Sequence, residues 1–217
     1  MSESQYLVRL GIPVVDERIG AIYPGSLILV EGSPDTYPHV MVHMSLNYHA
    51  MKATPVSYIT VMDDPEDYKL MAKNMGIRVE AYELNDIWRY DSALSIDEAI
   101  VKAVNHVSRN RLVALDLTGL RITRSHVEKL IEVIEANRSR QLLLYLLVTP
   151  QLVDTEPLYL LEKIAEVVFY LKTELSKEGV RRIIWVKKTK RILGKEIYLE
   201  YTLTTRGLEI ETVKRVI

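Results

Sequence analysis

The chain from residue 26 to residue 39 reads Ser26-Leu27-Ile28-Leu29-Val30-Glu31-Gly32-Ser33-Pro34-Asp35-Thr36-Tyr37-Pro38-His39. Residues 26–31 form an apolar run of strand length, which predicts a strand buried on both faces. Glycine, serine and proline in the next positions predict a turn. Apolar residues then recur with helical spacing over 38–51, and Thr36 or Asp35 can cap a helix whose first turn contains Pro38. The stretch predicts a strand, a turn and a helix in succession.

The same alternation continues along the chain. Further runs of strand length lie at residues 55–61, 78–84, 112–117, 141–148 and 167–171. Segments with helical periodicity lie between or after them, at residues 65–75, 95–109, 125–137 and 157–165. Strands that are apolar throughout and separated by helices are typical of a mostly parallel sheet with helices on both faces. The sequence therefore predicts an α/β fold.

The pattern changes near the C-terminus. After Thr173, strand-like segments follow one another without helices between them, at residues 180–187, 196–204 and 208–211. Turns are predicted at 193–195 and 206–207, where glycines occur. We therefore expect a C-terminal antiparallel β-hairpin at 180–211 that closes one edge of the sheet. Because no linker-like composition separates it from the rest, we predict a single domain spanning 1–217.

Composition excludes several classes of protein. The chain has 217 residues, 48% of them hydrophobic and 26% charged, which is typical of a globular protein. No apolar run approaches the ~18 residues of a membrane span, and residues 1–11 lack a signal-peptide pattern, so we expect a cytoplasmic protein. The absence of cysteine excludes disulfides, thiolate metal sites and cysteine nucleophiles. Scarce glutamine and abundant Glu, Lys and Arg are typical of a thermophile.

Several segments occur in an informative order. They are Gly-Ile-Pro-Val-Val-Asp-Glu-Arg-Ile-Gly-Ala-Ile-Tyr-Pro-Gly-Ser at 11–26, Ser-Tyr-Ile-Thr-Val-Met-Asp-Asp-Pro at 57–65, Leu-Val-Ala-Leu-Asp-Leu-Thr at 112–118, and the segments 162–168 and 201–210. In this order and spacing they resemble the ATPase core of the KaiC/RadA branch of the RecA superfamily, archaeal type. The resemblance covers nearly the whole chain. It implies a RecA-like fold, with a mostly parallel central sheet flanked by helices and a C-terminal antiparallel β-hairpin.

The chain departs from this family in the phosphate-binding loop. The family pattern G-x-x-x-x-G-K-[ST] supplies backbone amides and a lysine for the phosphates, and a hydroxyl for Mg²⁺. In the matching positions Gly32 is retained, but Tyr37 replaces the second glycine, Pro38 the lysine and His39 the hydroxyl residue. Asp35 adds a negative charge where the triphosphate would lie. We therefore expect no ATP hydrolysis, no tight binding of ATP·Mg²⁺ in the usual mode, and no cofactor.

Other ATPase positions are only partly retained. Asp116 matches the Walker B aspartate, although an aspartate followed by Thr118 and Gly119 is also an ordinary turn former. The family's paired catalytic glutamates fall on Met62 and Asp63, so one is lost and the other is shortened by a methylene. Without a bound phosphate, Asp63 would have no water to activate. These positions are predicted to be remnants, and no residue is predicted to be catalytic.

Two histidines raise the question of a metal site. His39 and His43 lie four residues apart on the predicted helix and therefore share one face. A metal would need a third ligand, for which Asp35 and His49 are the near candidates. Histidine pairs on helices more often pack or face solvent, and no metal site is predicted.

The C-terminal region is basic. From residue 176 to 217 there are eleven Lys or Arg against five Glu, a balance of +6, so the remainder of this −1 chain is −7. The candidate binding residues are Arg181, Arg182, Lys187, Lys188, Lys190, Arg191 and Lys195. On an exposed hairpin they could follow a phosphate backbone or an acidic protein surface, whereas lysines on a strand edge can simply discourage edge pairing. Lys187 also matches the family's lysine that reaches a neighbouring subunit's nucleotide, but Thr189 and Lys190 replace the arginine and glycine that follow it.

These features predict a catalytically inactive RecA/KaiC-like pseudo-ATPase that acts as an accessory or regulatory binding protein. The resemblance implies first a RadA-paralogue-like factor in recombination or repair, and second a regulator in an archaeal KaiC-like signalling or archaellum motor system. A third alternative is an ATPase that holds nucleotide through an atypical loop or a partner's P-loop. Expected partners are a RecA-family paralogue or further copies of the chain, because RecA-like cores assemble side by side. DNA is a further candidate through the basic hairpin, and no membrane contact is expected.

Overall fold

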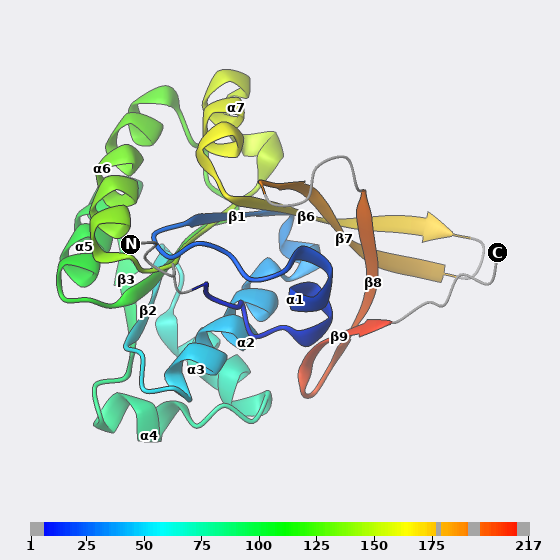
Figure 1. Ribbon diagram of the computed structural model, residues 1–217, viewed down its shortest axis with the longest axis horizontal. Coiled ribbons are helices and arrows are strands. Elements are labelled where there is room, and N and C mark those ends of the chain that lie inside the picture. Colours follow the sequence, from blue (N-terminus) through cyan, green and yellow to red (C-terminus); the bar gives the residue numbers. More distant parts are fainter. Residues whose placement is uncertain (1–6, 177–178, 191–195, 212–217) are drawn as a thin grey trace, which may run out of the picture.

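The computed structural model describes residues 7–176, 179–190 and 196–211. Its strands form one sheet in the order β3-β2-β4-β5-β1-β6-β7-β8-β9 (Figure 1). Their bounds are β1 Leu27–Gly32, β2 Val56–Val61, β3 Trp88–Ala93, β4 Leu112–Leu117, β5 Leu144–Val148, β6 Val167–Ser176, β7 Gly179–Thr189, β8 Ile197–Thr204 and β9 Gly207–Glu211. Pairs from β3 to β6 are parallel, and pairs from β6 to β9 are antiparallel.

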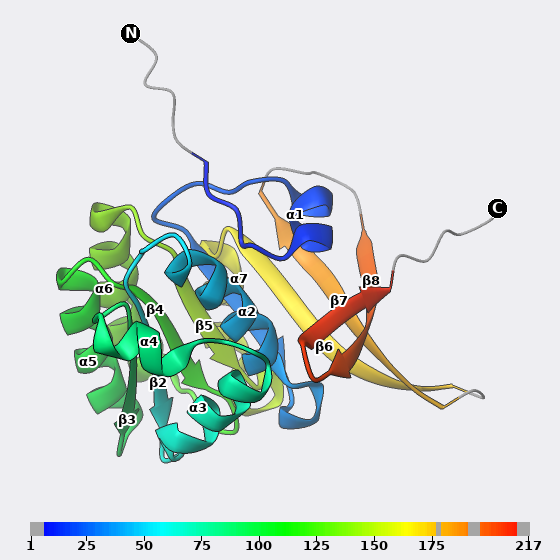
Figure 2. The same cartoon turned by 90° about the horizontal axis from the view of Figure 1, so that it is seen from below.

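Helices cover both faces of the parallel part of the sheet. They are α1 Pro13–Ile19, α2 Pro38–Ala50, α3 Pro65–Asn74, α4 Val79–Leu84, α5 Ile96–Ser108, α6 Arg124–Arg140 and α7 Thr155–Ile164, with short 3₁₀ helices at Pro34–Thr36 and Pro150–Leu152. Helices α1 to α4 pack on one face, and α5 to α7 pack on the other. Figure 2 shows β6 to β9 on the opposite side of the molecule from α5 and α6. The predicted fold class is confirmed.

Strand β1 shows why its sequence is apolar throughout. Ile28 and Val30 belong to the core beneath α2, whereas Leu27 and Leu29 belong to the core beneath α5 to α7. Because successive side chains of a strand point to opposite faces, a strand covered on both faces has no polar face. The apolar run therefore places β1 in the centre of the sheet.

The strand order brings three candidate segments to one edge. Strands β1, β5, β4 and β2 are consecutive parallel neighbours, so their carboxyl ends lie at the same edge of the sheet. The 33–37 loop follows β1, Asp63 follows β2, and Asp116 lies near the end of β4. Ligands of open α/β sheets bind outside the carboxyl ends of the strands, so a ligand site is expected at this edge.

One predicted strand was wrong. Of the predicted strand at 78–84, residues Val79–Leu84 form helix α4, in which Val79 is buried and Tyr82 packs three residues later against the same core. The strand of this region is β3, which follows α4 and was not predicted. It is an edge strand whose four middle residues are only partly buried or exposed, because one side faces solvent. An edge strand of mixed polarity gives a weak sequence signal. Helix α1 was also not predicted.

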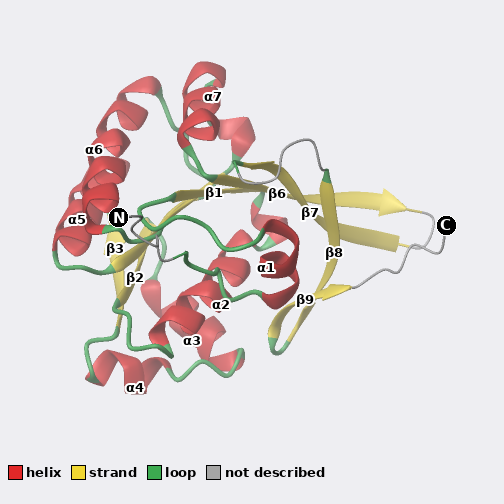
Figure 3. Cartoon of the chain, viewed as in Figure 1, coloured by secondary structure: helices red, strands yellow, loops and turns green. Residues whose placement is uncertain are grey.

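The C-terminal strands agree with the predicted antiparallel arrangement. Strand β6 continues to Ser176 and pairs with β7 along its length. The predicted turn at 206–207 joins β8 to β9, and Gly207 has a φ of 105° there, which favours glycine. The other predicted turn, at 193–195, lies outside the described residues. Figure 3 shows β6, β7 and β8 extending beyond the helices. In the described ranges, no helix is long and apolar enough to cross a membrane.

Candidate functional site

The loop after β1 has a compact backbone. Residues Pro34–Thr36 form a 3₁₀ turn, Tyr37 adopts a left-handed conformation with φ 52°, and α2 begins at Pro38. The prediction that Thr36 or Asp35 caps α2 was wrong, because the 3₁₀ turn uses both residues and Tyr37 occupies the N-cap position without a side-chain cap. Tyr37 therefore keeps the backbone geometry of a glycine position, while its ring lies 5.9 Å from the guanidinium carbon of Arg182.

The amides of this loop are largely used within the loop. Thr36 N–H donates to the Ser33 carbonyl at 3.0 Å, and Tyr37 N–H donates to the Pro34 carbonyl at 3.1 Å. Pro34 and Pro38 have no N–H to donate. The Thr36 hydroxyl also donates to the Ser33 carbonyl, at 2.7 Å. A phosphate cradle needs several amides directed at one anion, and here two of the amides donate to loop carbonyls and two positions are prolines without an N–H.

The loop also contains its own anion. Ser33 Oγ donates to Asp35 Oδ1, and Thr173 Oγ1 donates to Asp35 Oδ2 at 3.1 Å. The hydrogen bond from Ser33 lowers the pKa of Asp35, and the bond from Thr173 and the positive charge of Arg182 act in the same direction. The carboxylate is therefore ionised at neutral pH. A triphosphate at this position would face a fixed negative charge.

Asp116, the predicted Walker B remnant, is buried, and both of its carboxyl oxygens accept hydrogen bonds. The Tyr58 hydroxyl donates to its Oδ2, and the Thr118 N–H and hydroxyl donate to its Oδ1 at 2.9 and 2.6 Å. The turn-forming role weighed from the sequence is therefore present, with Tyr58 as an additional partner. Asp63, the other remnant, accepts a hydrogen bond from the Tyr68 hydroxyl at 2.9 Å.

The histidine pair lies in an aromatic cluster. The Nδ1 of His43 contacts the His39 carbonyl oxygen at 2.8 Å, and its ring packs against Tyr58 at a centroid distance of 4.3 Å. Complete burial lowers the pKa of His43 to about 3, so it is neutral. Burial also lowers the pKa of His39, against the opposing charges of Asp116 and Asp63. Among the described residues, no three His, Cys, Asp or Glu side chains are grouped as a metal site would require.

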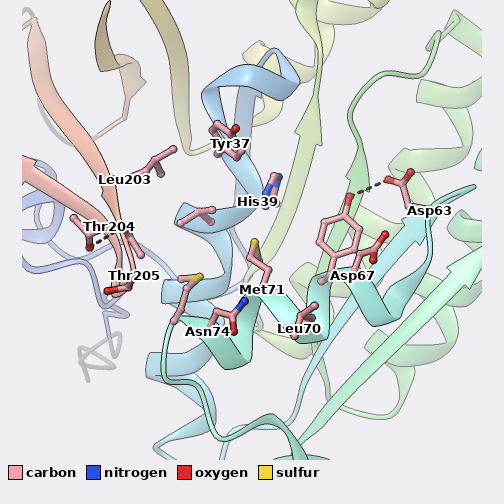
Figure 4. A pocket seen from close by; sticks show the side chains of 14 residues that line it. Tyr37, His39, Asp63, Asp67, Leu70, Met71, Asn74, Leu203, Thr204 and Thr205 are labelled. Atoms are coloured by element: carbon pink, nitrogen blue, oxygen red, sulfur yellow. Dashed lines mark hydrogen bonds between the residues drawn. The ribbon is translucent and has the colours of Figure 1, made fainter.

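A cavity opens beside the loop, between the start of α2, helix α3 and the β8–β9 turn (Figure 4). Its volume is about 690 Å³. Tyr37, His39, Asp63, Asp67 and Tyr68 line one part of it, and methionine, leucine and threonine side chains line the rest. This cavity could not be predicted from the sequence, because its walls come from segments that only the folded chain brings together.

The basic residues of β7 mostly contact the protein itself. Lys187 Nζ lies 2.9 Å from the buried Glu31 carboxylate and 2.5 Å from Glu162. Lys188 Nζ donates to the carbonyl oxygens of Glu162, Lys163 and Ala165 at the end of α7, at 2.6 to 2.8 Å. Cations are favoured at the C-terminal end of a helix. Both of these predicted binding residues therefore have partners within the chain.

The other basic candidates are placed as follows. Arg181 forms a bidentate pair with Glu200, and Lys190 lies 3.5 Å from Glu166. Arg182 faces the loop after β1, next to Tyr37. Arg191 and Lys195 lie outside the described residues. The negative partners Glu31, Glu162, Glu166 and Glu200 are distant in sequence, which is why a count of charges along the chain did not reveal them.

Comparison of the sequence with models of known families and with curated proteins gives no match. Solved structures do match. A KaiC-like protein from the hyperthermophilic archaeon Pyrococcus horikoshii superposes with a TM-score of 0.78 and 16% identity, over 95% of this chain and 99% of that one. The flagellar accessory protein FlaH of Methanocaldococcus jannaschii gives 0.77 and 13%, over 96% and 100%. At such identities the likeness shows the fold, and the predicted RecA-like fold is confirmed.

Proposed function

We propose that this chain is a RecA-like accessory protein that acts by binding a partner and does not hydrolyse ATP. The self-bonded loop after β1 is the main support. Two of its positions are prolines without an N–H, two of its amides donate to loop carbonyls, and Asp35 holds a negative charge against Arg182. At the positions where the family has the phosphate-binding lysine and the Mg²⁺-binding hydroxyl residue, this chain has Pro38 and His39.

The surroundings of the loop support the same proposal. Asp116 accepts three hydrogen bonds from Tyr58 and Thr118, so binding a hydrated Mg²⁺ would first require some of them to break. Lys187, which in the resemblance reaches a neighbour's nucleotide, is held by Glu31 and Glu162 of its own chain. The loop, Asp116 and Lys187 thus each have partners within the chain, at positions where the resemblance implies contacts with nucleotide or Mg²⁺.

A partner assay tests the accessory role. The purified chain is mixed with a RecA-type ATPase that has an intact P-loop and comes from the same source, and both association and phosphate release are measured. We expect a complex and a changed ATPase rate of the partner, with no phosphate release by the chain alone. The variant Tyr37→Gly/Pro38→Lys/His39→Thr, which restores the family pattern, serves as the comparison for nucleotide-dependent effects. Phosphate release by the natural chain would contradict the proposal.

The setting of this accessory role has two candidates. A recombination or repair role is what the resemblance to RadA paralogues implies, with the basic hairpin as the candidate DNA contact, although Lys187 and Lys188 of that hairpin contact the chain itself. A role in a signalling or motor assembly accords with the fold shared with a protein described as a flagellar accessory protein. The variant Lys190→Glu/Arg191→Glu separates the two settings. DNA binding through the hairpin should weaken in this variant and in high salt. Association with a signalling or motor partner should not depend on these two residues.

A further inference from the structure

The cavity beside the loop has negative charge at its wall and no positive charge to balance it. Asp63 and Asp67 line it, and no lysine or arginine of the described ranges does. Asp63 accepts a hydrogen bond from the Tyr68 hydroxyl. Within the described part of the chain, neither the Asp63 nor the Asp67 carboxylate forms an ion pair. His39 does not supply a cation either, because burial lowers its pKa. A ligand with a positive group would complement this wall.

The remaining walls are mostly apolar and include aromatic rings, with Asn74, Thr204 and Thr205 as their polar members. The His39 and Tyr68 rings meet edge to face at a centroid distance of 5.6 Å, and Tyr37 lies 5.8 Å from His39 on the other side. Met71 lies on α3, and Met75 directly follows this helix. Both line the opposite part of the cavity, together with Leu203, Val40 and Leu70. The volume of about 690 Å³ lies within the range of roughly 300–1,000 Å³ found for small-molecule sites.

We propose that this cavity binds a small organic amine with a planar apolar body. The ammonium group would lie against the two carboxylates, where charge-assisted hydrogen bonds and the aromatic rings both favour a cation. The planar body would contact the methionine side chains, which adapt to flat ligands. Phosphate-bearing and carboxylate-bearing molecules are disfavoured, because Asp63 and Asp67 would repel them.

Matched probes test this charge preference. Tryptamine and indole-3-acetate have the same ring system, but one carries an ammonium group and the other a carboxylate. The full chain is titrated with each, and binding is followed by calorimetry and by NMR. We expect saturable binding of tryptamine, with shifts at the cavity residues, and an affinity for indole-3-acetate that is lower by about tenfold or more. No saturable tryptamine binding, or equal affinity for the two probes, overturns the proposal.

Variants locate the site. Asp67→Asn removes one cavity charge and should lower tryptamine affinity by about tenfold. Glu66→Gln removes the same charge from the same turn of α3 but lies outside the cavity lining, so it should leave the affinity unchanged. Met71→Trp should fill the cavity and abolish binding of both probes. Equal losses in Asp67→Asn and Glu66→Gln, or unchanged binding in Met71→Trp, contradict the assignment.

The proposed site is independent of the proposed function. It depends on Asp63, Asp67 and the rings beside them, whereas the absence of ATP hydrolysis depends on the hydrogen bonds within the 33–37 loop. Probe titrations and phosphate-release assays therefore fail or succeed separately, and a failure of one leaves the other result standing.

Discussion

Lys187 on β7 places its ammonium nitrogen 2.9 Å from the carboxylate of Glu31, which is fully buried at the end of β1. Burial raises the pKa of Glu31 to about 7, even though Lys187 acts to lower it. Burial also disfavours the charge of Lys187, but its hydrogen bonds to Glu162 and Glu31 outweigh that effect and raise its pKa. The pair joins β1, the strand before the loop, to β7 across the intervening strand β6.

The pH dependence of stability should report the burial of Glu31. Its folded-state pKa, about 7, lies above the ordinary glutamate value of 4.5, so the folded protein holds this proton more tightly than the unfolded chain. The resulting stabilisation is full below about pH 4.5 and is lost as the pH rises through 7. In Glu31→Gln this contribution is absent. Urea unfolding at pH 5 and pH 8 should show that the stability of the natural chain relative to the variant falls by up to ~3 kcal/mol between the two. A constant difference would contradict this pKa shift.

The hydroxyl of Tyr58 should stabilise the fold through Asp116. Tyr58 is fully buried, and its hydroxyl donates to the buried Asp116 carboxyl group. Tyr58→Phe removes the donor and leaves the acceptor, so the free energy of unfolding should fall by about 1–3 kcal/mol. Tyr159→Phe is the control, because Tyr159 is exposed on α7. Equal stability of Tyr58→Phe and Tyr159→Phe, measured by urea unfolding, would show that the Asp116 contact contributes nothing.

Gly32 and Thr36 should be energetically coupled. A Cβ on Gly32 would lie 2.6 Å from Thr36 Oγ1, closer than the two atoms can approach. Gly32→Ala should therefore cost about 1–3 kcal/mol in the natural chain and less when Thr36→Ala has removed the hydroxyl. Unfolding free energies of the two single variants and the double variant test this coupling. Strictly additive costs would mean that the loop is more open than the structure shows.

The strands that could be predicted are those buried on both faces. The apolar runs that became β1, β2, β4 and β5 need no knowledge of their neighbours, because any helix-covered central strand has this composition. Strand β3 could not be found in this way, since it is an edge strand whose polar Arg89 and Asp91 pair with Asp86 and His106. The preceding 78–84 segment was misassigned because alternating apolar residues over so few positions fit a strand and a single helical turn almost equally.

The candidate site could be predicted where it depends on which residue occupies a position. It could not be predicted where it depends on which side chains contact one another. The residues Tyr37, Pro38 and His39, which the resemblance places in the phosphate-binding loop, are read from the sequence alone. The partners of Lys187 and Asp116 are not, since Glu31 lies 156 residues from Lys187 and Tyr58 lies 58 residues from Asp116 along the chain. The strand order brings such residues together, since β2 lies beside β4 and only β6 lies between β1 and β7, and that proximity has no local sequence signal.

Calorimetric titration of the purified chain with ATP and ADP, with and without Mg²⁺ and well below the melting temperature, tests the central claim most directly. The hydrogen bonds within the 33–37 loop, the charge of Asp35 and the missing lysine predict no saturable binding of either nucleotide under any of these conditions. Binding in the micromolar range, strengthened by Mg²⁺, would contradict this claim and would show that the loop holds nucleotide in another way.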